Sequence, residues 1–267
     1  MPRYRFTVEY FGTPFAGWQL QDGPSTVQGE LERALATALR LPPESAPRVH
    51  GAGRTDAGVH ATGQVAHFDL DDAADPRRLQ HSLNALAGPH IRVRGLEACD
   101  GTFHARFDAT ARRYLYRIAL RPVALLAPVS WHPVWPFDPS LFAAELRSAR
   151  GRRDFLNFSV PRDDGKSTVC DLRRADVERE GAFLHVRIEA DRFLHKMVRS
   201  LIGAAFDVAR GAHAPGLTED ILAGRFTGER FWAPPHGLSL EGVDYPDGYA
   251  PDGILPPRTG PQGGTAP

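Results

Sequence analysis

The sequence lacks the features that mark several classes of protein. No apolar run among its 267 residues approaches the roughly 18–20 residues that a membrane helix needs. The charged residues Arg3, Arg5 and Glu9 interrupt the apolar stretch that a signal peptide requires. Cys99 and Cys170 lie far apart and form no CxxC pair, which argues against a disulfide framework and a cysteine zinc site. We therefore expect a cytoplasmic protein with reduced thiols and no membrane association.

Lysine and cofactor motifs are also scarce. Lys166 and Lys196 are the only lysines, and Lys plus Arg equals Asp plus Glu at 32 each. Arginine binds phosphates and bases better than lysine does, although a GC-rich genome produces the same bias. The sequence contains no GxxxxGK, GxGxxG or nucleophile-elbow motif, and its eleven histidines form no HExxH. We therefore expect no nucleotide cofactor, no metal and no serine hydrolase triad.

Hydrophobic periodicity predicts alternating strands and helices in the first half of the chain. Alternating apolar residues predict strands over 4–10, 64–70, 91–98 and 110–120. The capping-box spacing of Ser25 and Gln28 predicts a helix that ends before Pro42. A second helix is expected after Asp75, with Pro76 at its first position.

The second half repeats this plan after a crossover over 121–139. We predict a helix capped by Asp138, a hairpin of strands 169–178 and 183–190, a long helix over 193–210, a short helix capped by Thr218 and a strand over 237–244. Each half then follows the βαββαβ plan of ferredoxin-like units, an α+β fold. The expected boundaries are 1–110, 111–245 and a Gly/Pro-rich disordered tail over 246–267.

The most unusual segment is 51–64, in which glycine and alanine flank an Arg-Thr-Asp sequence between two predicted strands. Glycine lets a ligand approach the backbone closely. Asp56 in this loop is either a turn-forming residue or a reactive carboxylate. Arg54 favours the reactive carboxylate because it can pair with Asp56 and stabilise its charge. The loop is also longer than a turn requires.

A second segment combines aromatic and basic side chains on one predicted strand. Tyr114 and Tyr116 share one face of that strand, whereas Arg113, Leu115 and Arg117 share the other. Such a strand either has one solvated face or places a base-stacking aromatic beside arginines that bind phosphate.

A third segment places basic residues at the start of the predicted long helix. Arg192, Lys196 and Arg199 have helical spacing near its N-terminus, where anions are favoured. The alternative is an ordinary solvated helix face.

Taken in their order along the chain, these segments resemble the motifs of the tRNA pseudouridine synthase A family. The resemblance runs from about residue 3 to residue 245 and leaves out only the tail. One such motif would be weak evidence, but the ordered set is highly specific. The matching motifs are Tyr10-Phe11-Gly12, Gly17-Trp18-Gln19, the residues 53–60, Phe103-His104-Ala105-Arg106-Phe107, Arg112-Arg113-Tyr114-Leu115-Tyr116, His195-Lys196-Met197-Val198-Arg199 and Gly237-Leu238.

The resemblance implies an activity, a site and an architecture. The family isomerises uridines 38 to 40 of the tRNA anticodon stem-loop, as a homodimer without metal or cofactor. It implies that Asp56 is the catalytic aspartate, that Arg54 pairs with it and guides a flipped base, and that Tyr114 stacks on the target uracil. The implied fold joins two ferredoxin-like (RRM-like) halves in a mixed, mainly antiparallel sheet with a basic cleft. Further candidate substrate-binding residues are Gly53, Thr55, His60, Arg106, Arg113, Lys196 and Arg199.

The sequence departs from the family pattern at three positions. Leu115 stands where a basic residue is common, Ser200 where asparagine is usual, and Ser239 where tyrosine often follows Gly-Leu. Changes at Leu115 and Ser200 can alter tRNA contacts, and Ser239 can loosen packing near the site.

One carboxylate is enough for the implied reaction, because the departing uracil stays bound and becomes the next nucleophile. The aspartate can attack C1′, add to C6 of the base, or take the C2′ proton, and the sequence does not choose among these routes. Two other functions are open: a non-catalytic RNA-binding protein, and a sugar hydrolase, which needs a second acid. Because the net charge is zero, an RNA enzyme requires arginines gathered in the cleft and acids elsewhere.

Overall fold

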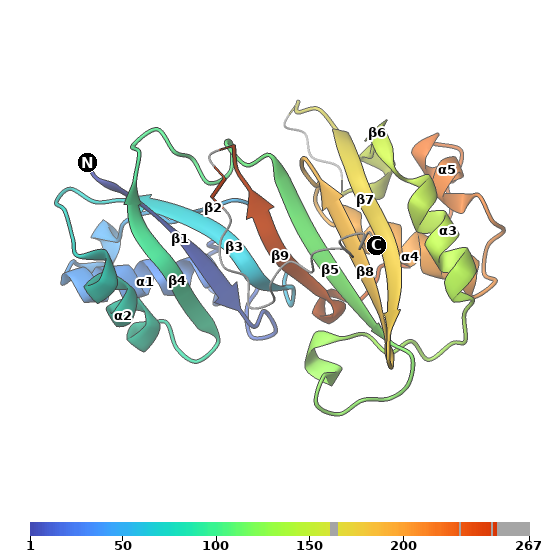
Figure 1. Ribbon diagram of the computed structural model, residues 1–267, viewed down its shortest axis with the longest axis horizontal. Helices are drawn as coiled ribbons and strands as arrows, with labels where there is room; N and C mark the ends of the chain where they lie inside the picture. The colour runs from blue at the N-terminus through green and yellow to red at the C-terminus, as the bar shows by residue number, and fades with distance from the viewer. Residues whose placement is uncertain (161–164, 230, 247, 250–267) are drawn as a thin grey trace, which may run out of the picture.

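A single sheet carries both halves of the chain. The computed structural model describes residues 1–160, 165–229, 231–246 and 248–249. The strands follow the order β4-β1-β3-β9-β5-β8-β7-β6 across the sheet. The short strand β2 lies outside this order and pairs with β3. Figure 1 shows the sheet along the longest axis, with β9 and β5 at its centre. The α+β fold class is confirmed.

The N-terminal half follows the predicted ferredoxin-like plan. Its elements are β1 (Arg3–Tyr10), α1 (Val27–Leu39), β2 (His50–Gly51), β3 (His60–Asp69), α2 (Pro76–Leu86) and β4 (Ile91–Cys99). Strands β1, β3 and β4 pair antiparallel, and the two-residue β2 occupies the remaining place beside β3. The sequence did not reveal β2 because two residues show no periodicity.

The C-terminal half repeats the plan with one added strand. Its elements are β5 (Ala111–Ala119), α3 (Pro139–Ser148), β6 (Gly151–Asp154), β7 (Val169–Glu180), β8 (Phe183–Ala190), α4 (Met197–Ala209), α5 (Leu217–Leu222) and β9 (Leu238–Asp244). The order β9-β5-β8-β7 matches the order of the first half, and β6 extends the edge. Short 3₁₀ turns occur at Pro43–Ser45, Ala127–Val129, Leu156–Phe158 and Pro235–Gly237.

The two halves meet where β3 runs parallel to β9. This junction is short, since only His60 pairs with Ser239 and Ala61 with Leu240. The final strand therefore lies between the halves, at the centre of the sheet. The predicted boundary at 110/111 coincides with the start of β5, but the division into separate units stays a prediction.

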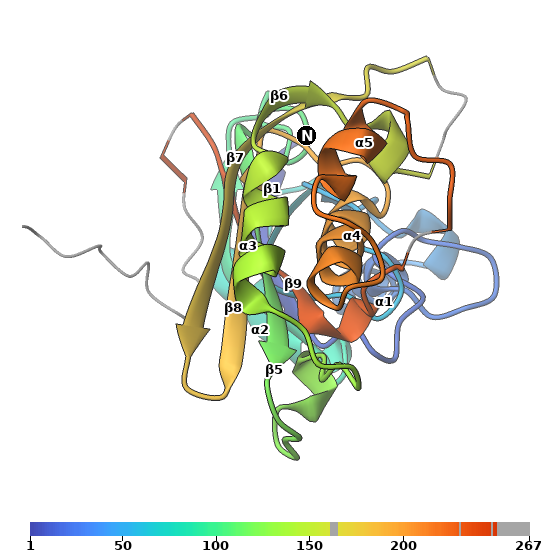
Figure 2. The same cartoon turned by 90° about the vertical axis from the view of Figure 1, so that its right-hand side faces the viewer.

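One face of the sheet carries the helices and the core. Tyr4, Phe6 and Val8 of β1 are buried on this face, where Phe68 of β3 stacks on Tyr4. Figure 2 shows α3, α4 and α5 together on one side of the strands. The opposite face, here called the open face, carries charged side chains such as Arg3 and Arg5. None of the helices in the described part of the chain has the length and apolar character that a membrane span requires.

Three helix starts differ from the predictions. Thr26, not Ser25, caps α1 by accepting from the backbone N–H of Gly29. Helix α4 begins at Met197 rather than at residue 193, because Lys196 adopts a left-handed conformation with φ of 63°. Arg192 and Lys196 therefore precede the helix, and the predicted basic stripe along one helix face is wrong. Gly216 caps α5, and Thr218 lies within it.

The predicted tail begins with an ordered contact. The guanidinium carbon of Arg5 lies over the Tyr249 ring, 3.9 Å from the ring centre. The same ring packs against Tyr245 and Phe103. The remainder of the predicted disordered tail, 250–267, lies outside the described residues.

Candidate active site

The loop that carries Asp56 is held by the preceding loop over residues 11–18. The backbone N–H of Trp18 donates to the carbonyl of Thr55 at 3.1 Å, and that of Gly58 donates to Phe15. Gly17 has φ of 103°, and a Cβ there would lie 2.6 Å from the same Thr55 carbonyl. Only glycine tolerates both conditions. The Gly17-Trp18 motif therefore positions the backbone of the Asp56 loop.

Asp56 is partly buried and faces two basic side chains. Its Oδ2 accepts from Nη1 of Arg199 at 3.1 Å, and its Oδ1 lies 3.5 Å from Nε2 of His195. Its side chain is 17% exposed, so the guanidinium compensates a carboxylate charge that water reaches only in part. The predicted partner was Arg54. The structure instead places Arg199 at this carboxylate, while Arg54 is exposed in the same loop.

Arg199 can reach Asp56 because of where α4 starts. The left-handed Lys196 turns the chain immediately before Met197, and Arg199 then lies in the first helical turn. Its Nε donates to the carbonyl of Ala233 at 2.8 Å, which leaves Nη1 directed at Asp56. The guanidinium is therefore fixed at both ends.

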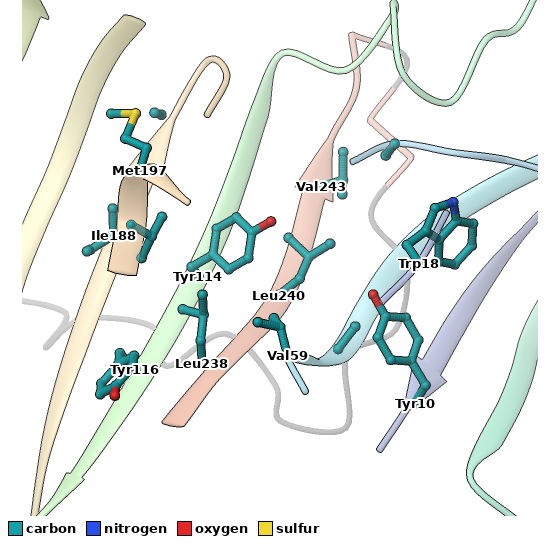
Figure 3. Packing of buried hydrophobic residues seen from close by; sticks show 14 of the residues in the cluster. Tyr10, Trp18, Val59, Tyr114, Tyr116, Ile188, Met197, Leu238, Leu240 and Val243 are labelled. Atoms are coloured by element: carbon teal, nitrogen blue, oxygen red, sulfur yellow. The ribbon is translucent and has the colours of Figure 1, made fainter. Parts of the chain in front are cut away.

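Tyr114 forms part of the wall of the same site. The residue is buried, and its ring meets Phe193 edge to face with 5.2 Å between ring centres. Figure 3 shows the ring extending from β5 toward Leu240 of β9. Burial raises the pKa of the Tyr114 hydroxyl well above its ordinary value, and the nearby Tyr10 and Asp56 raise it further by a smaller amount. The phenol is therefore neutral at physiological pH.

A cleft of about 1000 Å³ opens over Asp56 and Tyr114. Among the described residues that line it, acidic side chains are few and basic ones many. The acidic ones are Asp56 and Asp191, and the basic ones include Arg54, Arg106, Arg112, Lys166, Arg173, Arg192, Lys196 and Arg199. The cleft is thus strongly cationic although the chain is neutral overall.

Most predicted site residues line this cleft, but two do not. Gly53, Thr55, Arg106 and Lys196 contribute to its wall. Arg113 instead forms an ion pair with Asp244. His60 is buried, accepts from the backbone N–H of Gly12 at 3.0 Å and contacts the carbonyl of His236. The predicted substrate contacts of Arg113 and His60 are therefore not supported, because structural partners occupy both side chains.

Arg112 is a residue that sequence reasoning missed. Its guanidinium donates to the backbone carbonyls of Ala52, Arg106, Ala109 and Asp191, at 2.6–3.0 Å. It thereby joins the Asp56 loop to two other segments of the cleft wall. Burial lowers its pKa below the ordinary arginine value, although the residue stays charged. A signal for it was present in the sequence, because the alternation that puts Tyr114 on the inner face of the strand also puts Arg112 there and Arg113 on the opposite face.

The three departures from the family pattern are buried near the centre of the molecule. Leu115 is buried on β5, and Ser200 and Ser239 are also buried. The hydroxyls of both serines have no hydrogen-bond partner among the described residues.

Comparisons with known proteins identify the family of this chain. A model of the tRNA pseudouridine synthase family matches residues 7–108 and 146–246. A tRNA pseudouridine synthase A from Rhizobium leguminosarum is 40% identical, covering 98% of this chain and 96% of that protein. One from Allorhizobium ampelinum is 42% identical, covering 92% and 96%. A solved Cbf5-Nop10-Gar1 complex aligns at 10% identity and a TM-score of 0.33, over 76% of this chain and 53% of that one, a likeness too slight to support an argument. The chain belongs to the tRNA pseudouridine synthases, isomerases that convert uridine in tRNA to pseudouridine.

Proposed function

We propose that this enzyme modifies uridines 38, 39 and 40 of the tRNA anticodon stem-loop, with Asp56 as its catalytic residue and a flipped target base. The observation that carries the proposal is the Asp56–Arg199 pair, which lies in a cationic cleft next to the buried ring of Tyr114. The choice of nucleotides rests on the resemblance to the tRNA pseudouridine synthase A family.

The reaction exchanges one glycosidic bond for another. The bond from C1′ to N1 breaks, the uracil turns, and a bond forms from C1′ to C5. The C5 proton is then lost to solvent and N1 takes up a proton, so that the product is an isomer of the substrate. Asp56 serves by attacking C1′ as a nucleophile, by adding to C6, or by removing the C2′ proton. Uracil stays in the cleft throughout, so no water needs activation and the second carboxylate of a glycosidase is unnecessary.

Besides Asp56, Asp191 is the acid among the described residues that line the cleft, and its contacts argue against the hydrolase alternative. Its Oδ1 accepts from the backbone N–H groups of Asp171 at 2.8 Å and Arg192 at 2.7 Å. Those bonds fix the turn between β8 and α4. Asp191 therefore has a structural role, and the described residues that line the cleft offer Asp56 no partner acid for hydrolysis.

Base flipping costs a few kcal/mol of lost stacking, and the cleft offers compensation. The Tyr114 face supplies stacking, an interaction that contributes about 1–3 kcal/mol per base. Arg54, exposed at the mouth of the cleft, is suited to guide the base inward.

We also infer a cytoplasmic homodimer. Its support is the family resemblance and an apolar surface on the crossover between β5 and α3, where Leu125, Leu126, Val134 and Trp135 are exposed. Trp131 of the same crossover is buried against Phe206, so it belongs to the core. Sedimentation velocity of the pure enzyme and of Val134→Asp measures the oligomeric state, and a monomeric wild type contradicts the inference.

The test of the proposed function is site mapping. Unmodified tRNA transcripts with uridine at 38, 39 or 40 are incubated with the pure enzyme, and pseudouridine is located by carbodiimide labelling and primer extension. We expect product at these positions and none in transcripts with cytidine there. Modification confined to other uridines would contradict the proposed specificity. Binding without any product would support the non-catalytic alternative.

A further inference from the structure

A second pocket lies beside the catalytic cleft. It has a volume of about 370 Å³, within the range of sites for small ligands. Arg54, Arg106, Phe107 and Gln19 line both this pocket and the cleft. The two cavities are therefore neighbours that share a wall. We call the second one the side pocket; the residues that line it alone include Trp18, Arg48, His50 and His104.

Phe107 on the shared wall is an exposed aromatic held in a fixed position. It is 77% exposed, and its ring centre lies 4.3 Å from that of His104. Nδ1 of His104 accepts from the backbone N–H groups of Arg106 and Phe107. Arg112 donates to the backbone carbonyls of Arg106 and of Ala52, and so it links this segment to the Asp56 loop. A rigid, solvent-facing ring at the mouth of an RNA site is suited to stacking on a base.

The side pocket combines aromatic and cationic groups in the way that single-stranded RNA sites do. Arg48, Arg54 and Arg106 supply positive charge, and Arg48 is oriented by Glu32 at 3.3 Å. Burial lowers the pKa values of His50 and His104, so both rings are neutral at physiological pH. Neutral imidazoles add stacking surface, while the arginines supply the phosphate contacts.

Flipping of the target uridine creates a need for such a pocket. When one nucleotide leaves the stack, its neighbour loses a stacking partner on one side. We propose that the side pocket binds the base and phosphate of the nucleotide next to the target uridine, with Phe107 as the stacking surface and Arg48 on the phosphate. This inference rests on the proposed function, because it takes the cleft as the site of the target nucleotide.

The experiment pairs a side-chain deletion with a base deletion. We measure binding of tRNA to wild type and Phe107→Ala, using intact transcripts and transcripts with an abasic residue on the 5′ or the 3′ side of the mapped target. Phe107→Ala is expected to weaken binding of intact tRNA about ten-fold, the size of one stacked base. One of the two abasic transcripts lacks the base that the side pocket binds. Wild type and Phe107→Ala should bind that transcript with equal affinity. Phe107→Trp should restore binding.

Phe183→Ala is the matched control, since Phe183 also stacks on a histidine ring, His185, but lines neither cavity. It should bind intact tRNA as wild type does. Equal binding by wild type and Phe107→Ala, or an equal loss with intact and both abasic transcripts, would overturn the proposal. Because the abasic residue is placed beside whichever uridine the mapping identifies, a wrong choice of positions 38–40 does not affect this test.

Discussion

The cationic cleft and the open face of the sheet use the same residue types in opposite ways. In the cleft, basic side chains gather and acidic ones are few among the described lining residues. On the open face, arginines stand next to carboxylates, as in the pairs Arg3 with Asp69, Arg5 with Glu97 and Arg187 with Glu241. Because the chain has 32 basic and 32 acidic residues, the basic excess in the cleft is offset by acidic side chains elsewhere in the chain.

Net charge is therefore a poor guide to where this chain can bind RNA. A cleft lined with one sign of charge concentrates its field, whatever the sum over the chain. Paired charges on the open face leave little net field there and, being exposed in part, contribute little stability individually. Substitutions in the two regions should therefore differ in their effects, and matched pairs of variants measure that difference.

The largest difference is expected between two aspartates. Asp56→Asn should reduce pseudouridine formation by at least about 10³-fold, because it removes the only reactive carboxylate that we assign to the reaction. Asp244→Asn, which breaks the pair with Arg113 on the open face, should stay within about two-fold of wild type. Release of tritium from 5-tritiated uridine in tRNA measures both. Tritium release by Asp56→Asn at a rate near wild type would refute the catalytic assignment.

A smaller difference is expected between two arginine-to-lysine changes. Arg199→Lys should lower kcat about 10²-fold, since an ammonium group cannot donate to Ala233 and Asp56 together. Arg187→Lys, at the open-face pair with Glu241, should leave kcat unchanged. Single-turnover kinetics at saturating enzyme separates kcat from binding. A fully active Arg199→Lys would show that the two-ended fixation of the guanidinium is irrelevant to catalysis.

Arg54→Lys asks whether the predicted arginine also contributes. Its position at the mouth of the cleft implies a role in base capture, so we expect a loss of about ten-fold in kcat/KM, less than for Arg199→Lys. The same single-turnover assay at subsaturating enzyme provides the measurement. A loss larger than that of Arg199→Lys would reverse our ranking of the two arginines.

The salt dependence of binding should separate the two regions further. Arg192→Gln in the cleft should weaken tRNA binding about three-fold and reduce the slope of log K against log salt by about one. Arg150→Gln, whose side chain pairs with Asp176 outside the cleft, should change neither quantity. Filter binding between 50 and 300 mM salt (roughly the range in which such slopes are linear) tests this. Equal slopes for wild type and Arg192→Gln would remove Arg192 from the phosphate contacts.

The smallest effect concerns pH and the stability of the fold. Burial, followed by the nearby charges of His104, Arg3 and His50, lowers the pKa of His67 to about 4. An unfolded histidine titrates near 6.5, so as the pH falls the unfolded chain binds the proton first, and the folded state loses stability between about pH 6.5 and pH 4. Between pH 7 and pH 5, the free energy of unfolding of His67→Asn should fall by about 1–2 kcal/mol less than that of wild type, as measured by urea unfolding.

Local patterns predicted the parts of the site that lie on single elements. The Asp56 loop and the inward face of β5 with Tyr114 were visible because glycine content and alternation are local signals. The Asp56–Arg199 contact joins residues 143 positions apart, and no spacing rule reaches that far. Pattern reasoning also extended α4 through Lys196, because apolar periodicity continues across the residue while its backbone does not. The short strands β2 and β6 were missed for lack of length.

The central place of β9 has a consequence for how the enzyme comes into being. It is the last strand of the described chain, yet it fills the space between β3 and β5. During synthesis the N-terminal half emerges first and can fold early. The junction between the halves forms only after residue 244 has left the ribosome, and with it the wall of the cleft to which Leu238 contributes. A chain in which β9 has not yet been made therefore lacks part of this wall, and the cleft is complete only when β9 has docked between β3 and β5.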